Sequence, residues 1–266
     1  MNKYDYQPNI LRSGEVRVYD FGNIKIHNYN SNDALKDQVI IVEQNKNAVV
    51  IENPSFVRSG RELKKYLRSQ KLNVTAKILS YHWAGARFLP EVPAFSTAKA
   101  DQYGRNGNGS VMVARFSNIF GKKFDSNINP VTNIIKAGRN HIGGIEFNII
   151  ETEDAFDIEI PDANVIYTHM LGADAHSIVP SLTNLDTMIE RLTKYYERGY
   201  ALVLSTHHTP ENNDDIRTKI DYLHGLDKAV SSSQTAEDLK LAMHIRYPEC
   251  DRVDCLDITA NWLIRS

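Results

Sequence analysis

The first half of the chain alternates apolar and polar positions in a way that predicts strands. In residues 15–29, EVRVYDFGNIKIHNY, apolar side chains recur at every second position on either side of Gly22, which is typical of a hairpin. Residues 37–54, DQVIIVEQNKNAVVIENP, hold two apolar runs that are separated by the turn-like Gln44–Asn47 and stopped by Pro54. These runs predict a second hairpin, made of buried strands.

A helix and a further strand are predicted next. In residues 59–73, SGRELKKYLRSQKLN, Leu63, Tyr66 and Leu67 lie three and four positions apart and charges occupy the other positions, which predicts an amphipathic helix. Residues 73–82, NVTAKILSYH, then predict a strand that carries His82 at its C-terminal end.

Residues 91–110, EVPAFSTAKADQYGRNGNGS, favour a loop, and the three glycines at its end suggest that 101–110 is flexible, as either a lid or a solvated connection. The following residues 110–121, SVMVARFSNIFG, have helical spacing with Gly121 as a stop.

The second half again predicts strands followed by helices. Strands are expected within 138–153, 156–171 and 200–206, and 181–199 has the apolar stripe of a helix that ends at Gly199. Further helices are expected in residues 211–225 and 235–248, where Thr235 and Asp238 have the spacing of a capping box. This order predicts an α/β fold, a four-layer αββα sandwich formed as a single domain over 1–266, with two packed halves of about 1–150 and 151–266.

Composition narrows the class of protein. The 266 residues are 42% hydrophobic, enough for a substantial core, and 31 Lys and Arg against 33 Asp and Glu give no basic excess for nucleic acid. No secretory signal, membrane span or disulfide framework is predicted, so we expect a cytoplasmic protein with a small-molecule ligand or substrate and no membrane partner.

Histidines follow several predicted strands, where loops often carry chemistry. The candidate ligands at these strand ends are His82, His169, Asp174, His176, His207 and His208. Zinc needs three or four N, O or S ligands that converge on one point, so the arrangement is more informative than any single histidine.

The element order and two of these histidines resemble the metallo-β-lactamase fold superfamily over roughly residues 12 to 230. A hairpin that ends near an acidic turn precedes a helix, and a strand then leads into the position of the family's H-x-H-x-D-H loop. Here the loop is HWAGAR, in which only His82 matches. The family's final histidine is matched by His208, or by His207 after a shift of one residue.

The resemblance implies that the other ligand positions of the family are lost. These positions hold Ala84, Ala86, Arg87, Ala155 and Met170, with His169 directly before the last. Because the two matching histidines belong to different metal sites in the family, a pair of zinc ions is not expected to form. The implied function is an inactive or non-canonical hydrolase homologue that binds a small anionic ligand through His82, Arg87 and His208, with no cofactor.

On this hypothesis Arg87 takes a ligand position, so its guanidinium faces the former metal cavity. It would repel a metal and bind either an anion or an acid, with Glu153 and Asp154 as the first choices.

The alternative is a metal-dependent hydrolase with a rearranged mononuclear site. His82, His169 and His208, with His207, Asp174 or His176 as further candidates, would hold one zinc or another divalent metal. A serine nucleophile is less favoured, because the sequence has no G-x-S-x-G elbow.

Overall fold

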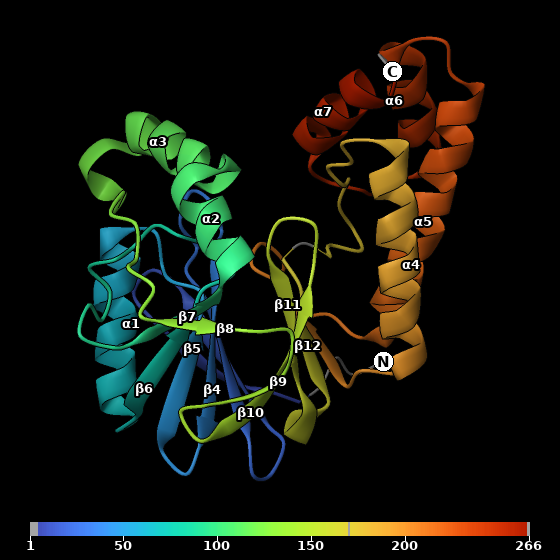
Figure 1. The fold of residues 1–266 in the computed structure, drawn as a ribbon. Coiled ribbons are helices and arrows are strands. Elements are labelled where there is room, and N and C mark those ends of the chain that lie inside the picture. The colour runs from blue at the N-terminus through green and yellow to red at the C-terminus, as the bar shows by residue number, and fades with distance from the viewer. Residues whose placement is uncertain (1–4, 170, 265–266) are drawn as a thin grey trace. The chain divides into compact units, whose positions relative to one another are not determined.

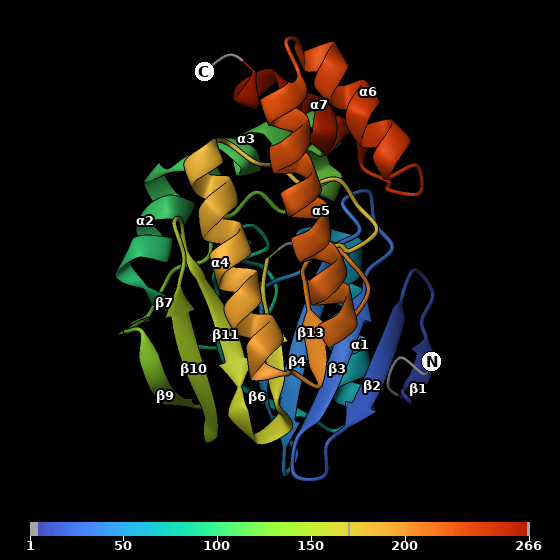
Figure 2. The same ribbon diagram turned by 90° about the vertical axis from the view of Figure 1, so that its right-hand side faces the viewer.

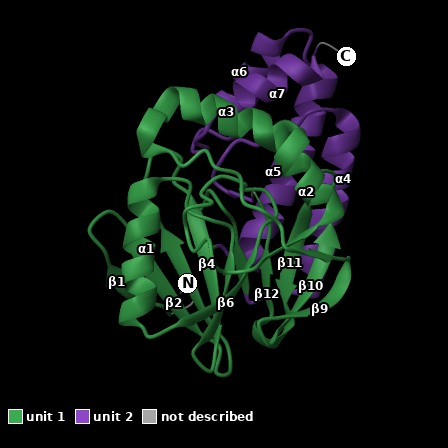
Figure 3. Ribbon diagram, turned by 60° about the vertical axis from the view of Figure 1, so that its left-hand side comes forward, with its two compact units in different colours: residues 1–170, 202–210 green, residues 171–201, 211–266 purple. Residues whose placement is uncertain are grey.

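The computed structural model describes residues 5–169 and 171–264, which divide into two compact units. Figure 3 shows the first unit, residues 1–170 and 202–210, in green and the second, residues 171–201 and 211–266, in purple. The first unit contains both β-sheets, and the second is helical.

The first sheet has eight strands in chain order. Figure 2 shows four of them, β1 to β4, side by side. Its strands are β1 (Gln7–Ile10), β2 (Glu15–Asp20), β3 (Lys25–Asn30), β4 (Gln38–Gln44), β5 (Asn47–Ile51), β6 (Asn73–Ile78), β7 (Ala94–Thr97) and β8 (Asn133–Ile135). The two hairpins expected from the sequence are confirmed as β2–β3 and β4–β5, both antiparallel. In the β4–β5 turn Asn45 and Lys46 both have positive φ, 51° and 67°, which suits the twist of a two-residue hairpin.

The second sheet has five strands in the order β13-β12-β11-β10-β9. They are β9 (Gly138–Ile142), β10 (Ile145–Glu151), β11 (Phe156–Ile160), β12 (Val165–Tyr167) and β13 (Leu202–Leu204), with a short 3-10 turn, η2 (Pro161–Ala163), before β12. One apolar core joins the facing sides of the two sheets, and it includes Ile40 and Val49 of the first and Phe147, Ile158 and Leu204 of the second. Strand β10 alternates between buried and half-buried positions, whereas β11, β12 and β13 are buried throughout.

Helix α1 (Val57–Ser69) covers the other side of the first sheet (Figure 1). Leu63 and Leu67 of the helix pack with Val16, Ile41 and Val50 of the strands, all of them buried. The helix predicted from the spacing of its apolar residues is thereby confirmed, and the sheet is covered on both faces within the first unit.

Residues 91–110 were expected to be a loop, and this expectation is wrong. They form β7, helix α2 (Ala98–Asn106) and the start of α3 (Asn108–Phe120), which is followed by a 3-10 turn, η1 (Gly121–Lys123). Thr97 caps α2 by accepting a hydrogen bond from the backbone N–H of Ala100, and Gly104 lies so close to Trp83 that a Cβ would be 1.9 Å from its Cδ2. Gly104 therefore allows close packing inside a helix and does not mark a flexible lid.

The second unit consists of α4 (Leu182–Arg198), α5 (Asn213–Ser232), α6 (Ala236–Arg246) and α7 (Val253–Leu263). The predicted end of α4 at Gly199 is confirmed, with φ +68°, and so is the capping box of Thr235 and Asp238 at the start of α6. Among the described residues, no helix combines the length and the apolar character that a membrane crossing requires.

Candidate metal centre

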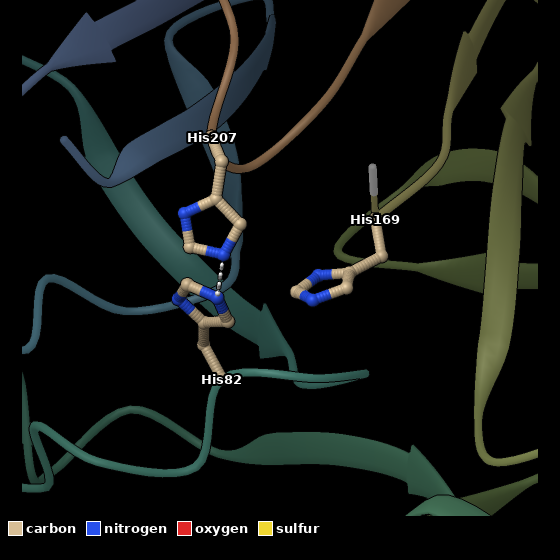
Figure 4. A group of neighbouring side chains, drawn as sticks. All are labelled: His82, His169 and His207. Carbon is tan, nitrogen blue, oxygen red and sulfur yellow. Dashed lines mark hydrogen bonds between the residues drawn. The ribbon is translucent and has the colours of Figure 1, made fainter. Parts of the chain in front are cut away.

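Three histidines from separate parts of the first unit converge on one point (Figure 4). His82 follows β6, His169 follows β12 and His207 follows β13. One ring nitrogen of each lies within 4.8 Å of the other two, and the Nε2 atoms of His82 and His207 are 3.2 Å apart. Nitrogens around a tetrahedral zinc ion, each about 2.0–2.1 Å from it, lie roughly 3.3 Å from one another. His82 and His207 therefore already have the spacing of two ligands of one metal ion, and His169 lies near enough to be the third.

Backbone hydrogen bonds hold the segments that carry these histidines. β12 and β13 are parallel, so their carboxyl ends meet at the same edge of the second sheet. Just beyond that edge the N–H of Thr206 donates to the carbonyl of His169 at 3.1 Å, and the N–H of Gln38 donates to the carbonyl of Thr206 at 2.7 Å. The start of β4 in the first sheet is thus tied to the loop that carries His207.

Glu52 fixes the loop that carries His82. Its buried carboxylate accepts the backbone N–H groups of Ser80, Tyr81 and His82 at 3.3, 2.8 and 3.0 Å, and the hydroxyl of Tyr167 at 2.8 Å. Burial raises the pKa of Glu52 to about 7, although these donors oppose the shift. A carboxylate with this many donors sets the position of the His82 backbone.

A second carboxylate, Asp37, lies behind two of the histidine rings. Its Oδ1 is 3.7 Å from Nδ1 of His207 and 3.9 Å from Nδ1 of His82, on the side of each ring away from the Nε2 pair. Asp37 is fully buried, and neither carboxylate oxygen makes a hydrogen bond of normal geometry with another described residue. Burial, together with the nearby carboxylate of Asp33, raises its pKa well above the usual value, and the hydroxyl of Ser55 opposes this shift only in part.

Burial also favours the neutral form of His82 and of His169. It lowers the pKa of His82 and of His169 well below the usual value, and the neighbouring imidazoles, His207 first, lower both further. A metal binds only the neutral imidazole, so these shifts favour a ligand role. The ring of Tyr81 stacks on that of His169, with centroids 4.3 Å apart and planes at 17°, which fixes the orientation of the third ligand.

Arg87 does not take the place that the motif alignment gave it. Its side chain is 71% exposed and its Nε is 3.5 Å from Asp125, whereas a buried guanidinium paired with Glu153 or Asp154 was expected. The loop turns at Gly85, which has φ +89°, and the backbone N–H of Arg87 donates to Asp125 at 2.8 Å. Phe88 then enters the core while Arg87 remains at the surface, so the expected direction of its side chain is wrong.

The remaining candidates lie outside the group of three histidines. His208 is half-buried, and its N–H donates to Ser205; Asp174 and His176 belong to the second unit. Met170, expected at a lost ligand position, lies outside the described residues. Asp37 was missed from the sequence, although an acid directly before the buried strand β4 is a usable signal.

Comparison with known proteins identifies the fold. No protein-family model matches the chain, and no curated protein matches it. Among solved structures, a β-lactamase domain protein from Burkholderia ambifaria has a TM-score of 0.62 at 14% identity, over 96% of this chain and 88% of that one. A metallo-β-lactamase family protein from Thermus thermophilus has a TM-score of 0.60 at 13% identity, over 90% and 91%.

A stereoselective inverting sec-alkylsulfatase from Pseudomonas sp. is similar with a TM-score of 0.61 at 13% identity, over 93% of this chain but only 49% of the sulfatase. This chain thus spans about half the length of that enzyme. The chain has the metallo-β-lactamase fold, and the α/β sandwich class expected from the sequence is confirmed. Identities this low show the fold alone.

Proposed function

We propose that this protein is a metal-dependent hydrolase with a single metal site, formed by His82, His169 and His207, that acts on a small-molecule substrate. The observation that carries the proposal is the convergence of three imidazoles beside a buried carboxylate, Asp37, whose oxygens make no hydrogen bond of normal geometry among the described residues. A buried carboxylate left in this state is costly. If His82 and His207 carry their ring proton on Nδ1, these N–H groups lie on the side of the carboxylate and would stabilise it.

The residues present fit a zinc ion or a similar divalent cation. Three histidine nitrogens with one open position form the donor set of a catalytic zinc site. When bound there, the metal supplies Lewis-acid chemistry for hydrolysis at neutral pH. The names of the structural neighbours given above, two β-lactamase-type proteins and a sulfatase, are names of hydrolases, which supports the proposed reaction class.

Side chains of the protein would hold the metal ion and orient the histidines that bind it. Because the Nε2 atoms of His82 and His207 face each other, both rings would use Nε2 as the ligand atom and keep the proton on Nδ1, on the side of Asp37, whose Oδ1 is 3.9 and 3.7 Å away. Glu52 holds the backbone of His82, and Tyr81 holds the ring of His169. Asp37 therefore selects the tautomer of two of the three ligands.

One metal is proposed, and not two. The positions that the family uses for further ligands hold Ala84, Ala86 and Ala155 here, and none of these has a donor atom in its side chain. Ala84 and Ala155 are packed in the core. Arg87 points to solvent. These residues support loss of the second site, as the resemblance implied.

The function implied by the motif alignment was an inactive homologue that binds an anion through Arg87 in the former metal cavity. This hypothesis loses its main support. That function needs the guanidinium beside the histidines. Instead, Arg87 is exposed and contacts Asp125.

The test is hydrolysis of a chromogenic panel by metal-free and metal-loaded protein. Nitrophenyl sulfate, phosphate, phosphodiester and carboxylic ester, together with nitrocefin, cover the main hydrolysed bonds. We expect at least one to be hydrolysed only by protein loaded with one equivalent of Zn²⁺ or Co²⁺, and loading with Co²⁺ to give the visible spectrum of a low-coordinate site with nitrogen ligands.

Two adjacent histidines provide a matched control. His207→Ala should remove both the hydrolysis and the cobalt spectrum, and His208→Ala should retain both. The proposal fails if metal-loaded protein shows no cobalt spectrum, or if His208→Ala loses the spectrum while His207→Ala keeps it.

A further inference from the structure

A separate cavity lies on the outer side of the first unit, along helix α1. It has a volume of about 890 Å³, within the range of small-molecule sites, and is bounded by α1, by the loops at 11–13 and 31–33, and by Lys123. Leu11, Phe56 and Tyr66 give it an apolar and aromatic wall. None of the proposed metal ligands lines it.

Five cationic side chains surround this cavity against two acidic ones. Arg58, Arg61 and Lys65 form one stripe of α1, with Arg12 and Lys123 on the flanking segments. None of the five makes an ion pair or a side-chain hydrogen bond with another part of the described chain. With five cations against two acids, the lining of this cavity has a net positive charge.

The two acids of the cavity are already engaged by uncharged donors. Glu62 accepts the N–H and the hydroxyl of Ser13 at 3.0 and 2.7 Å and the hydroxyl of Tyr29 at 3.0 Å. Asp33 accepts the hydroxyls of Ser31 and Ser59 at 2.6 and 3.1 Å and the N–H of Leu35 at 3.1 Å. Both acids line the cavity but are held by these bonds, so the five cations outnumber them among the charged groups available to a ligand.

The spacing of the cations indicates how many anionic groups a ligand needs. From Arg58 to Lys65 the stripe covers seven residues, or about 10 Å of helix axis. This is longer than one phosphate group. No side chain caps the start of α1, and its first turn contains no acid, so the positive end of the helix adds to the same field.

We propose that this cavity binds an organic polyphosphate, a small molecule that carries two or more phosphate groups on an apolar or aromatic body. The arginines and lysines bind the phosphates, and Phe56, Tyr66 and Leu11 contact the body. A hollow of about 890 Å³ has the size of a small-molecule site. The site is independent of the proposed metal centre.

The experiment is calorimetric titration of the whole protein with adenosine triphosphate and, separately, with inorganic tripolyphosphate, without added metal. We expect one equivalent of the nucleotide to bind, more tightly than tripolyphosphate and more weakly as salt increases. Arg61→Ala should weaken binding about tenfold, the usual effect of losing one charge-assisted hydrogen bond.

Arg68 on the same helix is the matched control. It is exposed and carries the same charge, but it does not line the cavity. Arg68→Ala should leave nucleotide affinity within about twofold. His207→Ala should also bind the nucleotide normally, which separates this site from the metal centre.

Three results would overturn the proposal. The first is no saturable binding of the nucleotide at millimolar concentration. The second is an equal loss of affinity in Arg61→Ala and Arg68→Ala, which would show unspecific attraction. The third is tighter binding of a twenty-nucleotide single-stranded RNA that increases with RNA length, which would assign the surface to nucleic acid.

Discussion

Each unit of the molecule contains a group of histidines, and the two groups differ in ways that sequence does not reveal. In the first unit the rings of His82, His169 and His207 face one another. In the second unit His176 is buried and its ring lies 5.6 Å from that of His244, edge to face. Burial lowers the pKa of His176, to about 4, just as it lowers those of His82 and His169. A depressed pKa therefore does not distinguish a ligand from a structural histidine.

The difference lies in what the ring nitrogens face. Nδ1 of His176 is 3.0 Å from the hydroxyl of Tyr222, and the nearby charged groups are Lys219 and Asp251. His244 is exposed on the last turn of α6. In the first unit, by contrast, nitrogens of three rings converge, with Asp37 behind two of them. Convergence together with a positioned carboxylate is what indicates a metal site.

The largest expected effect is on zinc affinity. His169→Ala removes one of three ligands and should lower the affinity by more than about 100-fold, a larger effect than loss of an outer carboxylate. His176→Ala, the same change in the other group, should leave zinc affinity within about twofold, because His176 is not a ligand. Competition with a chromophoric chelator measures both. Comparable losses in the two variants would end the distinction between the groups.

Asp37→Asn should have an intermediate effect. It should weaken zinc binding and stabilise the metal-free protein. Zinc affinity should fall about 10- to 100-fold, because the rings of His82 and His207 lose the carboxylate that orients them. The metal-free protein should become more resistant to urea, because a buried carboxylate that lacks well-formed hydrogen bonds is removed.

Glu211→Gln is the control for Asp37→Asn. Glu211 is a buried carboxylate of the second unit that accepts the N–H groups of Gly172 and Ala173 and has its pKa raised to about 7. Its substitution should not change zinc affinity. An Asp37→Asn protein that binds zinc as tightly as the wild type would remove Asp37 from the account.

The smallest effect is on the pH dependence of stability. The folded-state pKa of His176 is about 4 against 6.5 for the free side chain, so the unfolded chain binds the proton more readily between these values. Stability is therefore complete above pH 6.5 and is lost as the pH falls toward 4. Between pH 6.5 and 5 the loss should be about 1.6 kcal/mol in the free energy of unfolding.

His176→Gln should reduce this slope, and urea denaturation of both proteins at pH 7, 6 and 5 measures it. Lys219, His244, Tyr222 and Asp251 face the same ring and remain in both proteins, so the difference isolates His176. Identical slopes would mean that His176 does not titrate in this range.

The regular elements were predictable because their signals are local. The apolar runs of β4 and β5 and the stripe of α1 identify themselves within a few residues. The helix expected over 110–121 is confirmed as α3, but helix α2 was missed because Gly104 was interpreted by itself, whereas its role is set by Trp83, which is distant in sequence. A glycine in a helix and a glycine in a loop look alike until the contacting side chain is known.

The site was only partly predictable for the same reason. His82 and His169 were named as metal ligands, but His208 was preferred to His207, and a difference of one residue depends on how the chain turns after β13. There Ser205 accepts the N–H of His208. Arg87 was placed by its motif position, whereas the turn at Gly85 directs it outward.

The most direct test of the central claim is the number of zinc ions per chain. Purified protein would be stripped with a chelator, loaded with excess zinc, desalted and measured by elemental analysis. One zinc per chain, falling to less than about 0.2 in a protein that carries His82→Ala, His169→Ala and His207→Ala together, is the predicted result. Two zinc ions per chain, or none in the wild type, would contradict a single-metal centre at these histidines.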